Sequence, residues 1–235
     1  MRSRNGHGHH GSSKRPIPEA CVERLSLYVR ELTRLQGQGG AFVSSKRLAE
    51  HLRLTDAQVR RDLSYFGQFG TSGRGYEVRR LMTVLRDILG IHDRTWNVAL
   101  AGVGNLGEAL LAYRGFRERG FVVRVVVDAD SRKVGQTIQG LSVASSQQLE
   151  ELVRRHQIHI GIITVPSEAA QEVCDQLIAG GVRAIVNFAP ARLQVPVGVE
   201  LRNVDLALEL EALAFYLGRS NSRGAIHDFR KACRG

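Results

Sequence analysis

A glycine-rich turn in the middle of the chain constrains the fold more than any other feature of the sequence. The apolar run of residues 96–101 predicts a buried strand, and the motif Gly102-Val103-Gly104-Asn105-Leu106-Gly107 follows it directly. A strand that ends in G-x-G-x-x-G and leads into a helix is typical of a dinucleotide-binding unit. In such a unit Gly102 permits the tight turn, Gly104 lets the backbone approach a pyrophosphate, and Gly107 lets the helix pack against the strand.

A second apolar run, residues 121–127, ends in an acidic residue. Asp128 stands 21 residues after Gly107. This is close to the spacing of about 20 residues at which an acidic side chain meets the ribose hydroxyls. Because a carboxylate there would repel a 2′-phosphate, the sequence favours NAD(H) over NADP(H), although Arg132 and Lys133 follow closely and weaken that choice.

From residue 96 onward, expected strands alternate with expected helices. The strands are expected near 96–102, 121–127, 159–165 and 184–188, with short ones near 137–143 and 199–204. The helices are expected near 105–119, 146–157 and 167–180. This alternation predicts an α/β fold, a Rossmann-type doubly wound parallel sheet that helices cover on both faces.

Two further loops follow strands at the sheet edge where ligands of such folds bind. They are Thr164-Val165-Pro166-Ser167 and Asn187-Phe188-Ala189-Pro190. Their uncharged walls suit a neutral dihydronicotinamide better than a positively charged nicotinamide, because burial of an unpaired charge is costly. We therefore expect NADH to bind more tightly than NAD⁺. The candidate cofactor-binding residues from this pattern are Gly102, Val103, Gly104, Asn105, Leu106, Gly107, Asp128, Lys133, Thr164, Val165, Pro166, Asn187 and Phe188.

The first part of the chain is basic and rich in expected helices. The net charge is +10, and residues 1–90 carry 16 Lys and Arg against 8 Asp and Glu, whereas residues 91–235 carry 17 against 15. Such an asymmetry indicates a polyanionic partner for the first part. A helix is expected from Pro16 to the glycines at 37–40, a short one near 45–52, and a third near 56–66. The third begins with a capping box, in which Thr55 and Gln58 satisfy each other's amides.

Two short helices joined by a tight turn at Arg53-Leu54 indicate a helix-turn-helix. Its second helix should bury Val59, Leu63 and Phe66, leaving its other side free to meet a major groove. The glycine-rich segment 69–78 predicts a β-hairpin, the wing of a winged helix, with an unencumbered Arg74 at its tip suited to a narrow minor groove. The candidate DNA-binding residues are Ser45, Lys46, Gln58, Arg60, Arg61, Ser64, Tyr65 and Arg74.

These patterns divide the chain into five segments. They are a disordered basic arm at 1–15, a winged-helix DNA-binding domain at 16–90, a Rossmann NAD(H)-binding domain at 91–204, a dimerisation helix at 205–218 and a basic tail at 219–235. An amphipathic helix near 81–89 is expected to link the two domains. The helix of 205–217 is apolar over most of its circumference, which favours a subunit interface.

Composition narrows the class of protein further. No apolar run approaches the roughly 18–20 residues of a membrane span, and the first residues lack the apolar core of a secretory signal, so we expect a cytoplasmic protein. The wide spacing of Cys21, Cys174 and Cys233 favours free thiols over disulfides or a zinc site. No metal site is expected, since His7, His9 and His10 fit a flexible tail better than a ligand cluster.

Taken together, the motifs resemble those of the Rex redox-sensing transcriptional repressors. The resemblance covers about residues 16–218 and rests on residues 59–67, the wing through Gly75-Tyr76, residues 102–107, 164–166 and 187–190, and Asn203-Val204-Asp205. It implies a homodimer whose C-terminal helices are swapped between subunits. It also implies that the dimer binds double-stranded operator DNA and represses respiratory or fermentative genes until NADH rises relative to NAD⁺.

The resemblance also implies a switch. Arg30 would pair with Asp205 in the DNA-binding state, and in the NADH-bound state Asp205 would turn to Tyr113, which thereby joins the candidate cofactor residues. Leu206 departs from the family pattern, which often has Phe beside the nicotinamide at this place.

Two other classes stay open at the level of sequence. One is an NAD-dependent oxidoreductase, although the chain leaves no room for a substrate domain and shows no obvious base near the cofactor loops. The other is a CoA- or nucleotide-binding module that scaffolds partner proteins. Catalytic turnover would favour the first of these, and a lack of DNA retention would favour the second.

Overall fold

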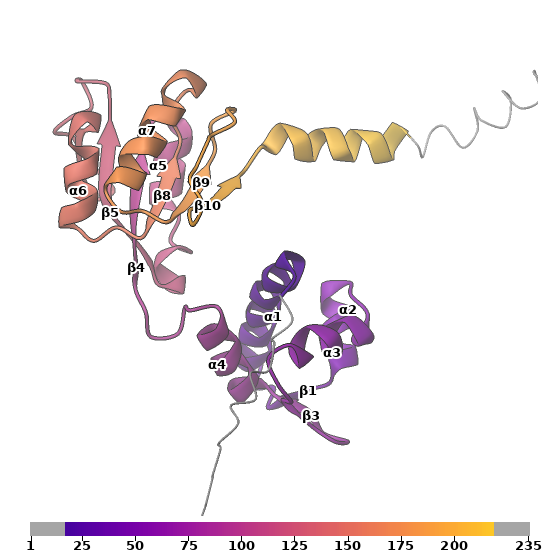
Figure 1. Cartoon of the computed structure of the whole chain (residues 1–235). Coiled ribbons are helices and arrows are strands. Elements are labelled where there is room, and N and C mark those ends of the chain that lie inside the picture. The colour runs from indigo at the N-terminus through magenta and orange to yellow at the C-terminus, as the bar shows by residue number, and fades with distance from the viewer. Residues whose placement is uncertain (1–16, 219–235) are drawn as a thin grey trace, which may run out of the picture. The chain divides into compact units, whose positions relative to one another are not determined.

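The computed structural model describes residues 17–218 as two compact units, one ending at Arg94 and the other beginning at Thr95 (Figure 1). The arm at 1–15, the tail at 219–235, Cys233 and the three early histidines lie outside the described residues. Among the helices of residues 17–218, none combines the length and apolar character that crossing a membrane requires. Cys21 and Cys174 are buried free thiols, and burial raises the pKa of each to about 11.

The first unit is a winged helix-turn-helix. Its helices are α1 (Glu19–Gly37), α2 (Ser45–Leu52), α3 (Asp56–Ser64) and α4 (Val78–Ile88). Its strands β1 (Phe42–Val43), β2 (Gly70–Thr71) and β3 (Gly75–Glu77) form an antiparallel sheet in the order β1-β3-β2. The wing is the hairpin of β2 and β3. The turn between α2 and α3 passes through Arg53, whose φ of 55° is left-handed.

Side-chain caps begin both helices of the helix-turn-helix. The Ser44 hydroxyl accepts from the Arg47 amide, and the Thr55 hydroxyl accepts from the Gln58 amide, each at 3.1 Å. The expected capping box is only half formed, because the Gln58 side chain turns instead to Asp62, at 2.7 Å. Helix α3 also ends at Ser64 rather than at residue 66.

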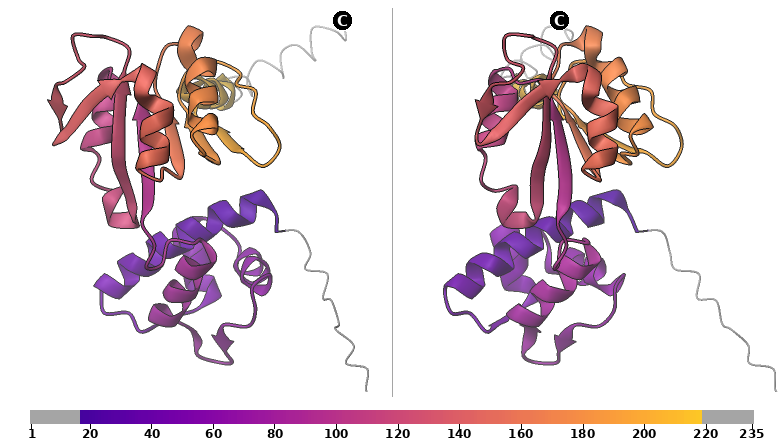
Figure 2. Two further views of the ribbon diagram at one scale, coloured as in Figure 1. Left: turned by 60° about the vertical axis from the view of Figure 1, so that its left-hand side comes forward. Right: turned by 90° about the vertical axis from the view of Figure 1, so that its left-hand side faces the viewer.

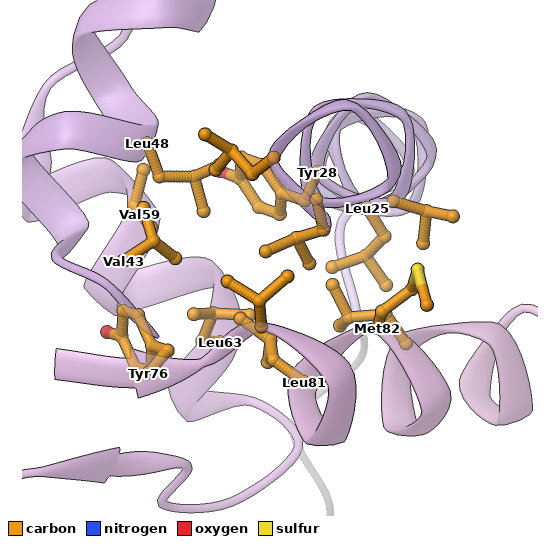
Figure 3. Close-up of a cluster of buried hydrophobic side chains, with 14 of the residues drawn as sticks. Leu25, Tyr28, Val43, Leu48, Val59, Leu63, Tyr76, Leu81 and Met82 are labelled. Carbon is orange, nitrogen blue, oxygen red and sulfur yellow. The ribbon is translucent and has the colours of Figure 1, made fainter. Parts of the chain in front are cut away.

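All four helices and the small sheet contribute to one core (Figure 3). Val59 and Leu63 are buried as expected, and Phe66 packs against the cluster. The amphipathic helix expected as a link is α4, and it belongs to this core: Leu81 and Leu85 are buried. The other buried members shown in Figure 3 include Leu25, Tyr28, Val43, Leu48, Tyr76 and Met82.

The second unit is built on a seven-stranded sheet. The strands are β4 (Trp96–Ala101), β5 (Phe121–Asp128), β6 (Thr137–Ile138), β7 (Leu141–Ser145), β8 (Ile160–Ile163), β9 (Ala184–Asn187) and β10 (Glu200–Asn203), in the order β10-β9-β8-β4-β5-β7-β6. All neighbours are parallel except β6 and β7, so the single strand expected near 137–143 is a hairpin. Without β6, the parallel strands have the order 3-2-1-4-5-6 that is typical of dinucleotide-binding sheets.

Helices cover both faces of this sheet (Figure 2). Alternate residues of β4 explain why: Ala99 and Ala101 pack on the side of α6 (Leu149–Arg155) and α7 (Ser167–Ala179), whereas Val98 and Leu100 pack on the side of α5 (Asn105–Ala112). Short 3-10 turns, η1 (Arg117–Arg119) and η2 (Ser146–Gln148), complete the layers. The helix expected to reach residue 119 stops at Ala112, because Tyr113 takes an extended backbone (ψ 101°).

A helix over residues 206–218 follows β10 after only two residues. The Asp205 carboxylate begins it by accepting from the Ala207 amide at 2.9 Å. Its large apolar side chains are 57–70% exposed, so the rest of the described chain leaves most of their surface uncovered. They are Leu206, Leu208, Leu210, Leu213, Phe215, Tyr216 and Leu217.

Candidate cofactor cleft and nucleic-acid interface

The glycine turn between β4 and α5 is packed so tightly that two of its glycines admit no side chain. Gly102 has a φ of +97°, and a Cβ on it would lie 2.8 Å from the Thr164 carbonyl oxygen. A Cβ on Gly107 would lie 2.1 Å from the Gly102 carbonyl oxygen, against 3.4–4 Å for ordinary contact. A Cβ on Gly104, by contrast, would meet no atom within 4 Å. The turn therefore leaves open space at Gly104, where a ligand has room to approach the backbone.

Helix α5 presents its N-terminus to that space. The Glu108 amide donates to the Gly104 carbonyl at 2.9 Å. The amides that precede Glu108 in the helix have no acceptor within it, and the helix dipole adds a partial positive charge there. No side chain caps this end. Such an end favours an anionic group, and above all a phosphate.

Asp128, at the end of β5, is fixed beside the glycine turn. Its carboxylate accepts from the Val103 amide at 2.7 Å and from the Asp130 amide at 2.8 Å. The Lys133 ammonium donates to the Val103 carbonyl at 2.7 Å and lies 3.5 Å from the Asp128 carboxylate. Burial alone would raise the pKa of Asp128, but the two amides and the Lys133 charge lower it below its usual value. The cleft therefore holds an ionised carboxylate.

These residues border a cleft of about 480 Å³. One wall is the glycine turn with Asp128 and Lys133, and the opposite wall is formed by residues 164–166 and the first turns of α7. The Thr164 hydroxyl ties the two walls together, since it donates to the carbonyl of Gly102 at 2.7 Å. The volume lies within the range of small-molecule sites, about 300–1,000 Å³.

On the first unit, a groove of about 680 Å³ separates α3 from the wing. The Arg60 guanidinium lies in its lining and is held by the Asp56 carboxylate at 2.7 Å and the Ser45 hydroxyl at 3.1 Å. Arg74 lies at the wing tip, between β2 and β3, and is exposed, but its guanidinium does not stand free. Its guanidinium lies 4.5 Å from the ring centroid of Phe42, a cation–π contact that holds it against β1.

Comparison with known proteins covers both units. Residues 16–64 match a family described as "Putative DNA-binding protein N-terminus", and residues 93–191 match one described as "CoA binding domain". The "Redox-sensing transcriptional repressor Rex" of Desulfitobacterium hafniense is 50% identical over 202 residues, which are 86% of this chain and 96% of that protein. The protein of the same description from Streptomyces coelicolor is 43% identical over 224 residues, 95% of this chain and 86% of its own.

The chain belongs to the Rex family of redox-sensing transcriptional repressors. Solved structures of a Rex-family repressor called RSP agree in fold over both units. RSP with β-NAD⁺ and operator DNA is 35% identical, with a TM-score of 0.85 over 91% of this chain and 98% of that one. RSP with β-NADH is 34% identical, with a TM-score of 0.81 over 91% of this chain and 100% of that one.

In this Rex-family chain, most of the candidate cofactor residues meet at one place. Residues 102–107 form the glycine turn, and Asp128, Lys133 and residues 164–166 border the same cleft. Leu106 is exposed beside the turn. Tyr113 is 52% exposed just after α5, with its ring edge-on to Phe116 at 5.2 Å between centroids.

The side chain of Asn187, a candidate cofactor residue, forms hydrogen bonds within the loop after β9 and to β10. Asn187 is fully buried, and its amide group donates to the carbonyls of Ala189 and Ala191, both at 3.1 Å, and to Asn203 at 2.9 Å. The side-chain oxygen Oδ1 of Asn187 accepts from the Ala189 amide at 2.9 Å. Its side chain therefore shapes the loop from within. Phe188 is half-buried and packs on the α5 side of the sheet.

The candidate DNA-binding residues mostly share the exposed side of α2, α3 and the wing. Lys46, Arg60, Arg61, Ser64, Tyr65 and Arg74 are exposed, and Ser45 and Gln58 are half-buried. Of the expected switch residues, Arg30 is exposed on α1 in the first unit, and Asp205 is exposed at the start of the last helix in the second.

Sequence reasoning missed a buried ionic network behind α3. Asp62 is 1% exposed and is bound by Arg24 and Tyr28 of α1. The signal in the sequence was an aspartate between Val59 and Leu63, on the side of the helix that should be apolar. A buried carboxylate needs donors, and only the fold shows that α1 supplies them.

Proposed function

We propose that this chain is a homodimeric repressor that holds operator DNA with its winged-helix units and releases it when NADH occupies the cleft beside Gly104. The observation that carries the proposal is the agreement in fold, over 91% of the chain, with a relative solved both with operator DNA and with β-NADH. The same chain joins a groove-facing helix to a phosphate-binding turn. Since its relatives are named repressors, we assign it a regulatory role and no catalytic one.

The cleft geometry supports a dinucleotide with free ribose hydroxyls. The amides at the start of α5 would hold the pyrophosphate over Gly104, and Asp128 would accept from the adenosine ribose. The ionised carboxylate of Asp128 would repel the 2′-phosphate of NADP(H). Lys133 would not offset this repulsion, because its ammonium group is already bound to the Val103 carbonyl and lies beside Asp128. Residues 164–166 and Phe188 would border the nicotinamide half, and their uncharged side chains favour NADH over NAD⁺.

The basic surface of the first unit supports DNA binding. Arg60 and Arg61 of α3 would meet phosphates or guanine edges of the major groove, with Ser45, Lys46, Gln58, Ser64 and Tyr65 around them. Arg74, packed on Phe42, would reach the flanking minor groove from the wing. A protein with these ligands works where DNA and the nicotinamide pool meet, in the cytoplasm.

Dimerisation and the switch complete the proposal. The apolar helix at 206–218 would be covered by a second copy of the chain, because a monomer that exposes so much apolar surface is unfavourable. Asp205, at the start of that helix, would exchange Arg30 for Tyr113 when NADH binds. A coupling of about 1–3 kcal/mol is typical of allostery, whereas a near-complete change of state needs about 5.5 kcal/mol.

A gel-shift titration on palindromic, A·T-rich duplexes tests the proposal. We expect retention without ligand or with NAD⁺, release by NADH, and no release by CoA. Arg61→Ala should weaken DNA binding and leave NADH binding to the free protein intact, whereas Arg155→Ala, an equal loss of charge on α6, should change neither. The proposal would be overturned if NADH did not release the bound duplex, or if the protein bound no duplex at all. Competitive titration of NADH and NAD⁺ that gave equal affinities would contradict the expected preference.

A further inference from the structure

The carboxylate of Asp62 lies inside the first unit, on the hidden side of α3. Arg24 grips it with two parallel hydrogen bonds, from Nε at 2.6 Å and from Nη2 at 2.8 Å. The Tyr28 hydroxyl donates to it at 2.6 Å, and the Gln58 amide nitrogen donates at 2.7 Å. Four donors from three side chains therefore converge on one carboxylate that is 1% exposed.

This carboxylate is ionised. Burial would raise the pKa of Asp62, but hydrogen bonds from Arg24, Tyr28 and Gln58 lower it below its usual value. Burial and the bond to Asp62 raise the pKa of Tyr28, so its hydroxyl keeps its proton and stays a donor. An ionised carboxylate can only accept, and each neighbour must turn a donor toward it.

This requirement settles the orientation of Gln58. The amide nitrogen must face Asp62, so the carbonyl oxygen Oε1 must point away from it. A free glutamine on a helix samples several rotamers and both amide orientations. Here the side chain is held at its tip by Asp62, one helical turn along α3, and Asp62 is itself held by α1.

Gln58 is half-buried and lies in the first turn of α3. It is the third residue of α3, and its backbone amide closes the Thr55 cap. The first residues of the recognition helix contact base edges in helix-turn-helix proteins. With one N–H committed to Asp62, the amide keeps its carbonyl oxygen and one N–H. That acceptor–donor pair complements the N6 and N7 edge of adenine in the major groove.

We propose that Arg24, Tyr28 and Asp62 form a clamp that holds Gln58 in one orientation so that it selects adenine at one position of each operator half-site. The inference rests on the proposed DNA-binding function. Gln58 is then the specificity-determining residue, and the three clamp residues are positioning residues that never touch DNA. Because Arg24 and Tyr28 belong to α1, base selection at this position depends on how α1 packs against α3.

Base-substitution profiles test this assignment. Dissociation constants would be measured at fixed salt on a retained duplex and on duplexes in which each half-site pair is replaced in turn. For the unaltered protein we expect one A·T pair whose replacement weakens binding by at least roughly tenfold. Replacing that adenine with 7-deazaadenine, which removes N7, should cost part of the same factor. Gln58→Ala should remove the preference at that pair and keep the profile elsewhere.

The clamp is tested by Tyr28→Phe, which keeps the ring in the core and deletes one donor to Asp62. We expect a smaller preference at the same pair and an unchanged profile elsewhere, whereas a purely structural role would weaken binding to all duplexes equally. Gln36→Ala, an exposed glutamine change on α1, is the matched control and should leave the whole profile intact. Far-UV circular dichroism and NADH binding report whether each variant is folded.

The outcomes separate the two proposals. A Gln58→Ala profile identical to that of the unaltered protein would overturn the assignment of Gln58, and a uniform loss in Tyr28→Phe would overturn the clamp. If Tyr28→Phe fails to fold, Arg24→Lys takes its place, because it loses the paired hydrogen bonds but keeps the charge. A smaller preference at the one pair would then support the clamp, and a uniform loss on all duplexes would overturn it. Absence of binding by the unaltered protein to any duplex would instead refute the proposed function.

Discussion

Two alanine substitutions three residues apart in the glycine turn should behave in opposite ways. The Gly104 backbone (φ −85°, ψ −169°) suits any residue, and an added Cβ meets no atom within 4 Å. Gly104→Ala should therefore leave the free protein as stable as before, within about 0.5 kcal/mol. The same methyl group would stand where the pyrophosphate must approach the turn.

The loss of NADH affinity can be worked out from the contacts at risk. If the methyl group keeps the phosphates away from two amides of α5, two charge-assisted hydrogen bonds are lost, at roughly 1.5–3 kcal/mol each. A loss of about 3 kcal/mol corresponds to a dissociation constant more than roughly 100-fold higher. The Gly104→Ala repressor should then hold DNA normally and ignore NADH concentrations that release the unaltered protein.

Gly107→Ala is the contrasting variant. Its Cβ would stand 2.1 Å from the Gly102 carbonyl oxygen, which is backbone and cannot rotate away. The turn must open, so the midpoint of thermal unfolding should fall together with NADH affinity. Differential scanning calorimetry and the fluorescence of bound NADH measure the two effects. Should Gly104→Ala bind NADH as tightly as the unaltered protein, the pyrophosphate does not sit at Gly104 and the cleft assignment is refuted.

Three further predictions follow from other contacts. Asp128→Ala should weaken NADH binding by at least about tenfold, since a hydrogen bond to a charged group contributes about 1.5–3 kcal/mol. Release of DNA should then need more NADH. An NADH titration identical to that of the unaltered protein would show that Asp128 is not part of the site. Because the pKa of Asp62 is lowered in the folded state, its ion pair stabilises the first unit above the unfolded pKa of about 3.9 and stops doing so as pH falls through the folded value. Urea unfolding should therefore show that the unaltered protein loses stability below about pH 4, and Asp62→Asn should lack this loss. At pH 7 the variant should be less stable than the unaltered protein by about 3–5 kcal/mol, because its buried ion pair is broken. Leu210→Asp in the last helix should give monomers by sedimentation equilibrium and poor retention of DNA, whereas a dimer that survived would place the interface elsewhere.

The sequence was most informative where local patterns decide structure. Short continuous apolar runs predicted β4, β5 and β9 to within a residue or two, and Thr55 caps α3 as its position predicted. The glycine motif predicted the turn because sterics at Gly102 and Gly107 exclude other residues there. These inferences needed no knowledge of distant contacts.

Distant contacts explain what the sequence could not reveal. Asp62 and Arg24 are separated by 38 residues, and nothing local shows that α1 delivers a guanidinium to α3. The Asp62 carboxylate also accepts from the Gln58 side chain, which is therefore turned away from the capping box. The Phe42 ring that holds Arg74 comes from a strand two residues long, too short for periodicity to detect.

The buried amide of Asn187 has a mechanical consequence for the last helix. It is bonded both to the loop that follows β9 and to Asn203 on β10, while the Asn187 backbone carbonyl receives the Val204 amide at 2.8 Å. Only Val204 and Asp205 separate that anchor from the helix. The direction in which the helix of 206–218 leaves β10 is therefore coupled to the loop after β9, and a displacement of that loop would be expected to turn the helix with it.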